Sequence, residues 1–128
     1  MNYLHTSSYE DIVKNNYYYV DKTSALKSVF EDDWSQVLLF TRPPYFGKTL
    51  TMSMFNSFLS LNYDDPNDLS GHIKLFNDKE IYKDKAFCNK FMGKYPVIFI
   101  SFKEVKGETF KDAYKKNSQR NLYSSFKL

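Results

Sequence analysis

Apolar residues recur at the three- and four-residue spacing of amphipathic helices in several parts of the chain. Residues 7–15 predict a short helix capped by serine, and the stretch between Thr23 and Asp32 predicts a second helix. Asp21 or Thr23 is the expected cap of the second helix. The longest pattern starts at Lys48, and its apolar stripe consists of Leu50, Met54, Phe58 and Leu61. Such a stripe indicates a helix buried against a sheet, although core packing alone explains the same residues.

Two continuous apolar runs, at residues 37–40 and 97–100, predict buried strands of the kind found in parallel sheets. Between them, residues 62–71 are rich in Asn, Asp, Pro and Gly and predict a surface loop, while residues 80–93 predict a short irregular helical segment. Helical spacing resumes at Glu108. The order of strand, helix, loop, strand and helix predicts an α/β fold, in which a parallel sheet with right-handed crossovers has flanking helices.

The length of the chain limits how much of such a fold it can hold. Its 128 residues, 42% of them hydrophobic, allow one core, so residues 1–128 are expected to belong to one domain. Two strands make a poor parallel sheet, because the edges and one face are hard to cover. The last amphipathic pattern also runs to the final residue without a cap. We therefore expect a truncated fold, the N-terminal part of a longer one.

Composition and charge favour a soluble cytoplasmic protein. The net charge of +3, from 18 basic and 15 acidic residues spread along the chain, does not require a nucleic-acid partner. Aromatic residues make up 19% of the chain, and core packing explains them better than a platform for stacking bases does. No apolar stretch approaches the roughly 18–20 residues needed to cross a bilayer, and no secretory signal is visible. A single cysteine, Cys88, indicates a reducing compartment and an inert thiol.

The residues with the clearest chemistry lie where the first apolar run meets the longest predicted helix. Gly47, Lys48 and Thr49 form the second half of a phosphate-binding motif, in the order strand, loop and helix that this chemistry requires. In that context Lys48 contacts phosphate oxygens, Thr49 can bind Mg²⁺, and the helix directs its positive end at the anion. Arg42 replaces the first glycine of the motif, so spacing alone matches only half of the pattern. An exposed lysine at an ordinary helix start is the alternative.

Other polar residues carry less information. Asp21 and Lys22 either border a nucleotide or cap and solvate the following helix, and their spacing does not choose between these roles. His5 and His72 belong to no catalytic or metal-binding pattern and are interpreted as surface residues. Glu104, which follows the second apolar run, is also interpreted as a surface residue.

Three stretches of the chain form a recognisable set. They read Tyr-Tyr-Tyr-Val-Asp-Lys-Thr at 17–23, Leu-Phe-Thr-Arg-Pro followed by Phe-Gly-Lys-Thr-Leu within 39–50, and Tyr-Pro-Val-Ile followed by Ser-Phe-Lys within 95–103. Together they resemble the predicted AAA-ATPase-like family of bacterial proteins, in which an ATPase-like domain is often followed by a domain similar to the PD-(D/E)XK nucleases. The resemblance covers essentially the whole chain and implies a P-loop fold whose phosphate loop begins with Arg-Pro.

The resemblance implies that Arg42 belongs to the phosphate loop and that ATP and Mg²⁺ are the ligands. The chain departs from the family at Pro44 and Tyr45, where two basic residues are usual. Pro44 also lacks a backbone donor for phosphate, so weakened nucleotide binding is expected. Thr49 is the implied Mg²⁺ ligand. The implied nucleotide site consists of Arg42, Phe46, Gly47, Lys48, Thr49 and Leu50.

The resemblance also places the acidic residue that hydrolysis requires on a further strand, beyond residue 128. ATP binding without hydrolysis is therefore the expected function of the chain, and its class as an enzyme stays open. The alternative is a degenerate, non-catalytic remnant whose loop is only a structural turn and which acts as an interaction module. A protein partner or self-association fits this alternative, a nucleic-acid-binding module ranks last, and a membrane is not an expected partner.

Overall fold

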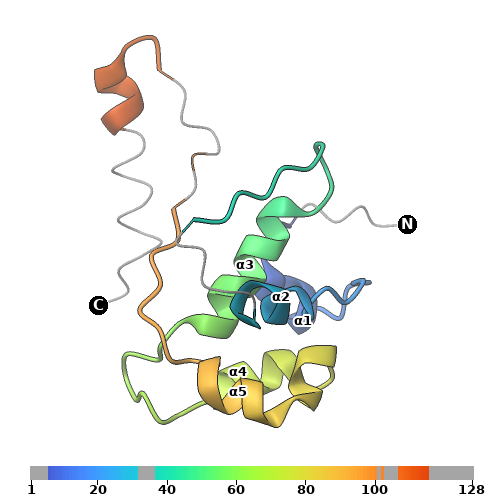
Figure 1. Cartoon of the computed structure of the whole chain (residues 1–128). Helices are drawn as coiled ribbons and strands as arrows, with labels where there is room; N and C mark the ends of the chain where they lie inside the picture. The colour runs from blue at the N-terminus through green and yellow to red at the C-terminus, as the bar shows by residue number, and fades with distance from the viewer. Residues whose placement is uncertain (1–5, 32–36, 101, 103–106, 116–128) are drawn as a thin grey trace. The chain divides into compact units, whose positions relative to one another are not determined.

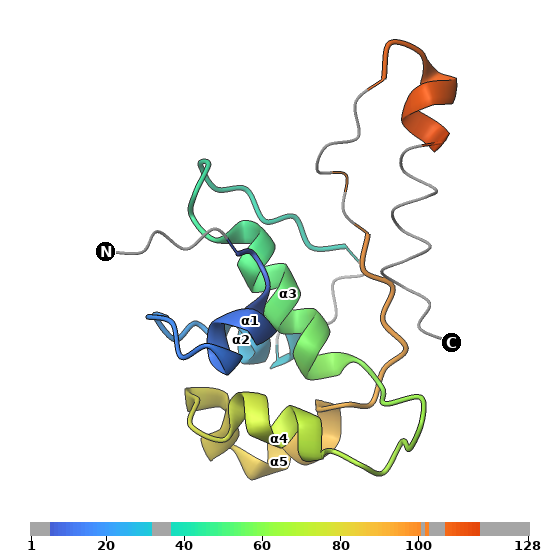
Figure 2. The ribbon, with the colours of Figure 1, turned by 180° about the vertical axis from the view of Figure 1, so that it is seen from behind.

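The computed structural model of the chain describes residues 6–31, 37–100, 102 and 107–115. The chain divides into two compact units, Met1–Pro96 and Val97–Leu128, which we call the first and the second unit. Figures 1 and 2 show α4 and α5 next to each other in the first unit, beneath the group formed by α1, α2 and α3. The elements of this unit are α1 (Tyr9–Lys14), α2 (Ala25–Glu31), α3 (Lys48–Leu59), α4 (Ser70–Phe76), the 3-10 helix η1 (Glu80–Lys83) and α5 (Lys85–Phe91).

Side-chain caps explain where two of these helices begin. At the start of α1, the Ser8 hydroxyl accepts a hydrogen bond from the Asp11 N–H at 3.3 Å. The Asp84 carboxylate caps α5 in the same way, through a 3.0 Å bond from the Phe87 N–H. Each cap satisfies a backbone donor that has no partner inside the helix. These contacts confirm the serine-capped helix predicted near the N-terminus and the short helical segment predicted within residues 80–93.

The core of the first unit is formed by helices and is rich in aromatic rings. Phe58 of α3 is completely buried, and its ring contacts those of Phe76 and Phe87, with centroids 5.1 and 6.0 Å away. Tyr9 of α1 stacks on Phe76 at 5.0 Å. Helices thus enclose Met54 and Phe58 of the stripe predicted for α3, while Leu61 lies beyond the end of that helix. Core packing accounts for these aromatic rings, as expected. The buried hydrophobic residues are Tyr9, Ile12, Leu26, Met54, Phe58, Phe76, Ile81, Phe87, Cys88, Phe91 and Met92.

Tyr9 links three helices through its backbone and its side chain. Its N–H donates to the Ser53 hydroxyl of α3 at 3.0 Å, and its phenol donates to the Leu75 carbonyl of α4 at 3.0 Å. Burial, together with the nearby phenol of Tyr19, raises the pKa of Tyr9 well above its ordinary value. The phenol therefore stays protonated and keeps the proton that it donates to α4.

The predicted parallel sheet, and with it the α/β P-loop class, is wrong for the part of the chain that the structure describes. Residues 37–40 and 97–100 have no helical structure there, and neither run forms a strand. All four side chains of the first run are exposed, and in the second run Ile98 and Ile100 are exposed; the exposed fractions reach 82% for Val37 and 79% for Ile98. The runs belong to different units, and a strand forms only where a second backbone supplies its hydrogen bonds. An apolar run shows that a segment can form a strand, but it does not supply that partner.

A short backbone contact closes the C-terminal end of α3. Among the described residues, Ser60 and Tyr95 form an isolated parallel bridge, in which the Leu61 N–H donates to the Tyr95 carbonyl at 2.8 Å. The Gly93 N–H donates to the Phe58 carbonyl at 2.9 Å. Gly93 has a φ of 67°, in the left-handed region that glycine adopts without strain. This conformation lets the chain after α5 turn back onto the end of α3.

The loop predicted over residues 62–71 is confirmed for most of its length. Asn62 and Asp68 hold it by accepting hydrogen bonds from the backbone two residues on, at 3.1 and 2.9 Å. Such local bonds are typical of turns rich in Asn and Asp. Helix α4 has no counterpart among the predicted elements, because the loop-like composition extends into its first turn at Gly71.

In the second unit, the described residues include a helical stretch at 110–115. The Thr109 hydroxyl precedes it, accepts from the Asp112 N–H at 3.3 Å and donates to the Asp112 carboxylate at 2.7 Å. This reciprocal bonding is a variant of the capping box. Helical spacing predicted from Glu108 is thus confirmed at these positions. His5, Glu104 and the later helical positions Leu122, Tyr123 and Phe126 lie outside the described residues.

Asp21 connects two segments that are far apart in the sequence. One carboxylate oxygen accepts from the Thr23 N–H, and the other accepts from the Glu80 N–H at the start of η1, both at 2.8 Å. The buried Thr23 hydroxyl accepts from the Ile81 N–H at 3.1 Å. Burial alone would raise the pKa of Asp21, but these hydrogen bonds and the charge of Lys79 hold it below its ordinary value. The ionised carboxylate therefore stabilises the junction with η1.

An Asp21→Asn substitution should weaken the fold at neutral pH and lose its effect in acid. We expect the free energy of unfolding to fall by about 1 kcal/mol at neutral pH, because water screens the bonds of an exposed carboxylate. Since the folded pKa lies below the unfolded one, this contribution is present above about pH 4 and disappears as the pH falls through the folded pKa. Urea unfolding of both proteins, from neutral pH down to about pH 3, measures the difference.

Asp64→Asn is the control for this prediction. The Asp64 side chain is exposed and makes no hydrogen bond with a described residue, so its replacement should change stability by less than about 0.5 kcal/mol. A stability difference between wild type and Asp21→Asn that does not change with pH would contradict the assigned role of the ionised carboxylate.

Candidate functional site

Residues 41–47 form the loop that leads into α3, and two of them have a left-handed backbone. Gly47 immediately precedes α3 with a φ of 76°, and Tyr45 has a φ of 64°. Glycine adopts this conformation readily, whereas it costs another residue about 1–2 kcal/mol. The Tyr45 side chain is fully exposed, so packing of its ring does not offset that cost. Other contacts must therefore hold the loop in this shape.

Lys48 provides such contacts. Its ammonium group donates to the Arg42 carbonyl at 2.7 Å and to the Pro43 carbonyl at 2.9 Å. An ammonium group has three N–H donors, so one remains for a further acceptor. The lysine predicted to bind phosphate thus lies folded against the backbone of its own loop, with one donor left over.

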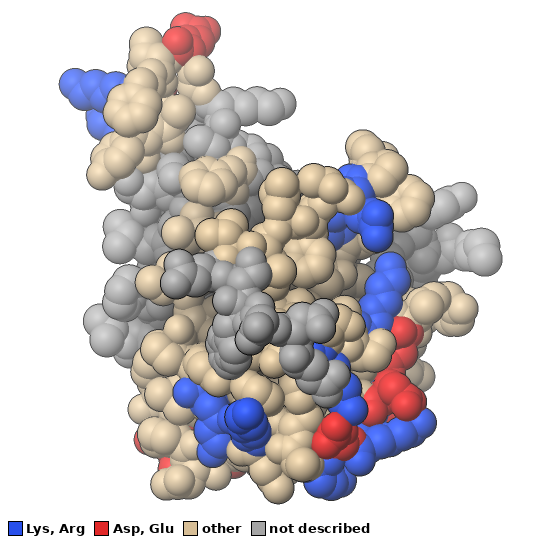
Figure 3. Space-filling model, in the orientation of Figure 1, with Lys and Arg blue, Asp and Glu red and all other residues tan. Residues whose placement is uncertain are grey.

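The first turn of α3 offers backbone donors to an anion. The N–H groups of Lys48, Thr49 and Leu50 have no acceptor inside the helix, because its first hydrogen bond runs from Thr51 to the Gly47 carbonyl, at 2.8 Å. No side chain caps this end, and no acidic residue lies in the first turn. The Thr49 side chain is exposed and makes no hydrogen bond with a described residue. Basic side chains lie on the side of the first unit where α3 begins, which adds to the positive end of its dipole (Figure 3).

The remaining predicted site residues divide into two kinds. Arg42 and Phe46 are exposed on the loop, where their side chains are accessible to a ligand. Leu50 instead packs, partly buried, against the hydrophobic core. The side chain of Leu50 therefore contributes to the hydrophobic core, and only its backbone N–H is a candidate ligand-binding group.

A lysine from another part of the chain reaches this loop. Lys22 Nζ lies 3.8 Å from the point that a Cβ on Gly47 would occupy. Among the described residues the Lys22 ammonium group has no hydrogen bond or ion pair. The neighbouring Asp21 is different, because both of its carboxylate oxygens already accept backbone N–H groups. Spacing along the sequence does not reveal this distinction, which depends on the fold.

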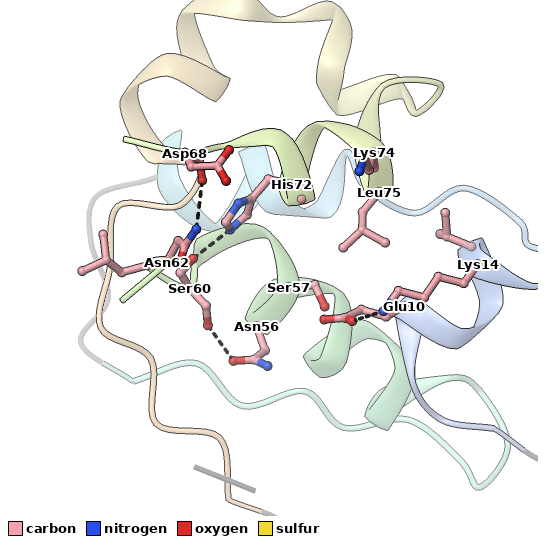
Figure 4. Close-up of a pocket in the computed structure, with 13 residues that line it drawn as sticks. Glu10, Lys14, Asn56, Ser57, Ser60, Asn62, Asp68, His72, Lys74 and Leu75 are labelled. Atoms are coloured by element: carbon pink, nitrogen blue, oxygen red, sulfur yellow. Dashed lines mark hydrogen bonds and ion pairs between the residues drawn. The ribbon is translucent and has the colours of Figure 1, made fainter. Parts of the chain in front are cut away.

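A groove of about 560 Å³ lies elsewhere in the first unit, between α1, the C-terminal half of α3 and α4 (Figure 4). Its polar side chains mostly bond within the protein: Lys14 pairs with Glu10 at 2.8 Å, and His72 Nε2 donates to the Ser60 carbonyl at 2.8 Å. His72 is thus partly buried, and not the surface residue expected from the sequence. The residues that line the groove include none from loop 41–47, so groove and loop are separate features.

Cys88 is buried beside η1, and its thiol donates to the Ile81 carbonyl at 3.4 Å. Burial raises the pKa of the Cys88 thiol and so disfavours its reactive thiolate form, in line with the interpretation of an inert cysteine. No group of three or more His, Cys, Asp or Glu side chains within the described ranges is arranged to hold a metal ion. In the same part of the chain, no helix has the length and apolar character needed to cross a membrane.

Similarity to a known family extends over nearly the whole chain. The model of the family described as predicted AAA-ATPase matches residues 4–127, a range that includes loop 41–47, α3 and the turn around Lys22. No curated protein and no solved structure matches the sequence. Because the family model covers far more than half of the residues, the chain belongs to the predicted AAA-ATPase family.

Proposed function

We propose that the chain binds the phosphate groups of a nucleotide, with ATP and Mg²⁺ as its ligands, at loop 41–47 and the first turn of α3. The observation that carries this proposal is the geometry around Lys48. The left-handed Gly47 turns the loop directly into α3, so backbone donors, an ammonium donor and the Thr49 hydroxyl lie at one end of the helix. Membership in the predicted AAA-ATPase family supports a nucleotide as the source of the phosphate.

Each group at this end of α3 has a separate chemical role in the proposal. The N–H groups of the first turn bind phosphate oxygens, and the positive end of the helix dipole favours their charge. Lys48 keeps its two bonds to the loop carbonyls and gives its third N–H to a phosphate. Thr49 supplies a hydroxyl oxygen for Mg²⁺, which prefers oxygen ligands and is bound together with phosphates. Arg42 is exposed on the same loop and adds a second cation.

The competing function is a structural turn that binds no ligand, and one observation favours it. The Lys48 ammonium group already has two backbone acceptors, which gives it a role in the unliganded protein. Pro44 also removes one N–H group from the loop. The two functions differ in one measurable respect, since only the first predicts nucleotide affinity in a folded chain.

Replacing Lys48 by alanine should lower the affinity for a fluorescent ATP analogue about 10- to 100-fold, because one charge-assisted contact contributes roughly 1.5–3 kcal/mol. Thr49→Ala should affect only the part of the nucleotide affinity that depends on Mg²⁺. It should leave binding without Mg²⁺ unchanged and reduce only the gain in affinity that Mg²⁺ provides. Fluorescence anisotropy titrations with and without Mg²⁺ measure both effects.

Lys94→Ala is a matched control for the removal of a lysine charge. Lys94 is exposed and follows Gly93, which contacts the opposite end of α3, so this variant should bind like the wild type. Circular dichroism and urea unfolding show whether each variant keeps its fold. Absence of binding by a folded wild-type chain, or equal binding by Lys48→Ala, would exclude the proposed function and leave the structural turn.

A further inference from the structure

The backbone on both sides of Lys22 is anchored to the first unit. Asp21 holds the N–H groups of Thr23 and Glu80, and the Thr23 side chain is completely buried. Lys22 itself donates its N–H to the Tyr19 phenol at 3.4 Å. The turn is therefore fixed relative to η1 and to the core, and the Lys22 side chain extends from a defined position.

From this turn the Lys22 ammonium group reaches the glycine that begins α3. Its Nζ lies 3.8 Å from the position that a Cβ on Gly47 would occupy, which is ordinary van der Waals distance from that point. Lys48 uses two donors on loop carbonyls, whereas all three Lys22 donors lack an acceptor among the described residues. The two ammonium groups thus differ: Lys48 maintains the loop, and Lys22 has its full hydrogen-bonding capacity available.

Positive charge of three origins is found around the loop that leads into α3. They are the Lys22 ammonium, the Lys48 ammonium and the N-terminal end of the α3 dipole, and no acidic residue lies in the first turn of that helix. A polyanion bound at this loop is attracted by each of these positive charges. A chain of phosphates is such a polyanion.

We infer that Lys22 is a second phosphate-binding lysine, which contacts the phosphate chain of the nucleotide next to Gly47. The inference rests on the proposed function and adds to it a residue outside the Gly-Lys-Thr motif. Lys48 holds the loop and donates one N–H, while Lys22 donates from its position beside Gly47. Asp21 positions Lys22 through the backbone and does not itself contact the ligand, because both of its carboxylate oxygens are engaged.

The test removes the Lys22 charge and leaves a polar side chain only one bond shorter. Lys22→Gln should weaken binding of the fluorescent ATP analogue about 3- to 10-fold at low ionic strength, and Lys22→Arg should retain most of the affinity. Added salt should reduce the difference in affinity for the ATP analogue between wild type and Lys22→Gln, since salt screens an exposed charge. Inorganic tripolyphosphate, used as a competitor, should lose affinity in Lys22→Gln by the same factor, because Lys22 acts on the phosphates.

Four outcomes are possible, and they separate this inference from the function on which it rests. Weaker binding of both ligands by Lys22→Gln, with an unchanged unfolding midpoint and normal binding by Lys94→Gln, supports it. If Lys48→Ala abolishes binding while Lys22→Gln binds both ligands like the wild type, the inference is overturned and the proposed function stands. A folded wild type that binds neither ligand overturns both. A lowered unfolding midpoint in Lys22→Gln would assign Lys22 to the fold and overturn the inference alone.

Discussion

Truncation of Phe58 to alanine should reduce the free energy of unfolding by about 3–5 kcal/mol. The Phe58 ring is completely buried on α3 and contacts the rings of Phe76 on α4 and Phe87 on α5. Removal of the ring loses its transfer free energy and also leaves a cavity, which packed helices fill only in part. Small domains are stable by about 5–15 kcal/mol, so this single change should remove about a fifth or more of the total.

Urea unfolding followed by far-ultraviolet circular dichroism measures this loss. Phe46→Ala is the matched control, because the same ring is deleted at a side chain that is 61% exposed. Its stability should change by less than about 0.5 kcal/mol. A loss below about 1 kcal/mol for Phe58→Ala would contradict the described core, since it would mean that the ring is not enclosed.

Gly93→Ala should destabilise the first unit by about 2–5 kcal/mol, through two effects that add. The backbone at Gly93 has a φ of 67°, which costs a residue with a Cβ about 1–2 kcal/mol. The new Cβ would also lie 2.6 Å from Leu69 Cδ2 and 3.2 Å from His72 Cε1. Both neighbours must move, and the turn that closes the end of α3 must move with them, which costs roughly 1–3 kcal/mol more.

Gly71→Ala provides the comparison, because the substitution is the same and the surroundings differ. Gly71 lies in α4, and no atom is within 4 Å of its Cβ position, so alanine should stabilise the protein by about 0.5–1 kcal/mol. A second comparison separates the two costs at Gly93. In a Leu69→Ala background the closest clash is absent. The free energy of unfolding lost through Gly93→Ala should then approach the cost of the left-handed backbone alone. Equal stability of Gly93→Ala and Gly71→Ala in thermal unfolding would contradict the left-handed conformation at Gly93.

Most helices could be located from the sequence, because their signals lie within a few residues of one another. Ser8 caps α1 through a neighbour three positions on, and the Asp84 cap of α5 works over the same distance. The apolar stripe of α3 repeats within one turn, and its members Met54 and Phe58 are completely buried. Helix α4 escaped the prediction because its first turn shares the composition of the preceding loop.

The candidate site could be predicted only in part. The motif Gly47-Lys48-Thr49 and its place at the start of a helix are local features, and the structure puts all three residues at the N-terminal end of α3. The bonds from the Lys48 ammonium to the loop carbonyls depend on the conformation of the loop, and residue spacing does not specify that conformation. The approach of Lys22 to Gly47 depends on packing between segments that are distant in the sequence.

The sequence by itself determined three things about this protein: where most helices lie, which motif begins α3, and membership in the predicted AAA-ATPase family. Only the tertiary structure decided that the apolar runs at 37–40 and 97–100 form no strand in the described chain, and that Lys22 joins the loop. The physical reason is the range of the contacts involved. A helix cap or stripe is completed by residues within one or two turns, whereas the hydrogen bonds of a strand and the neighbours of a lysine come from distant backbone.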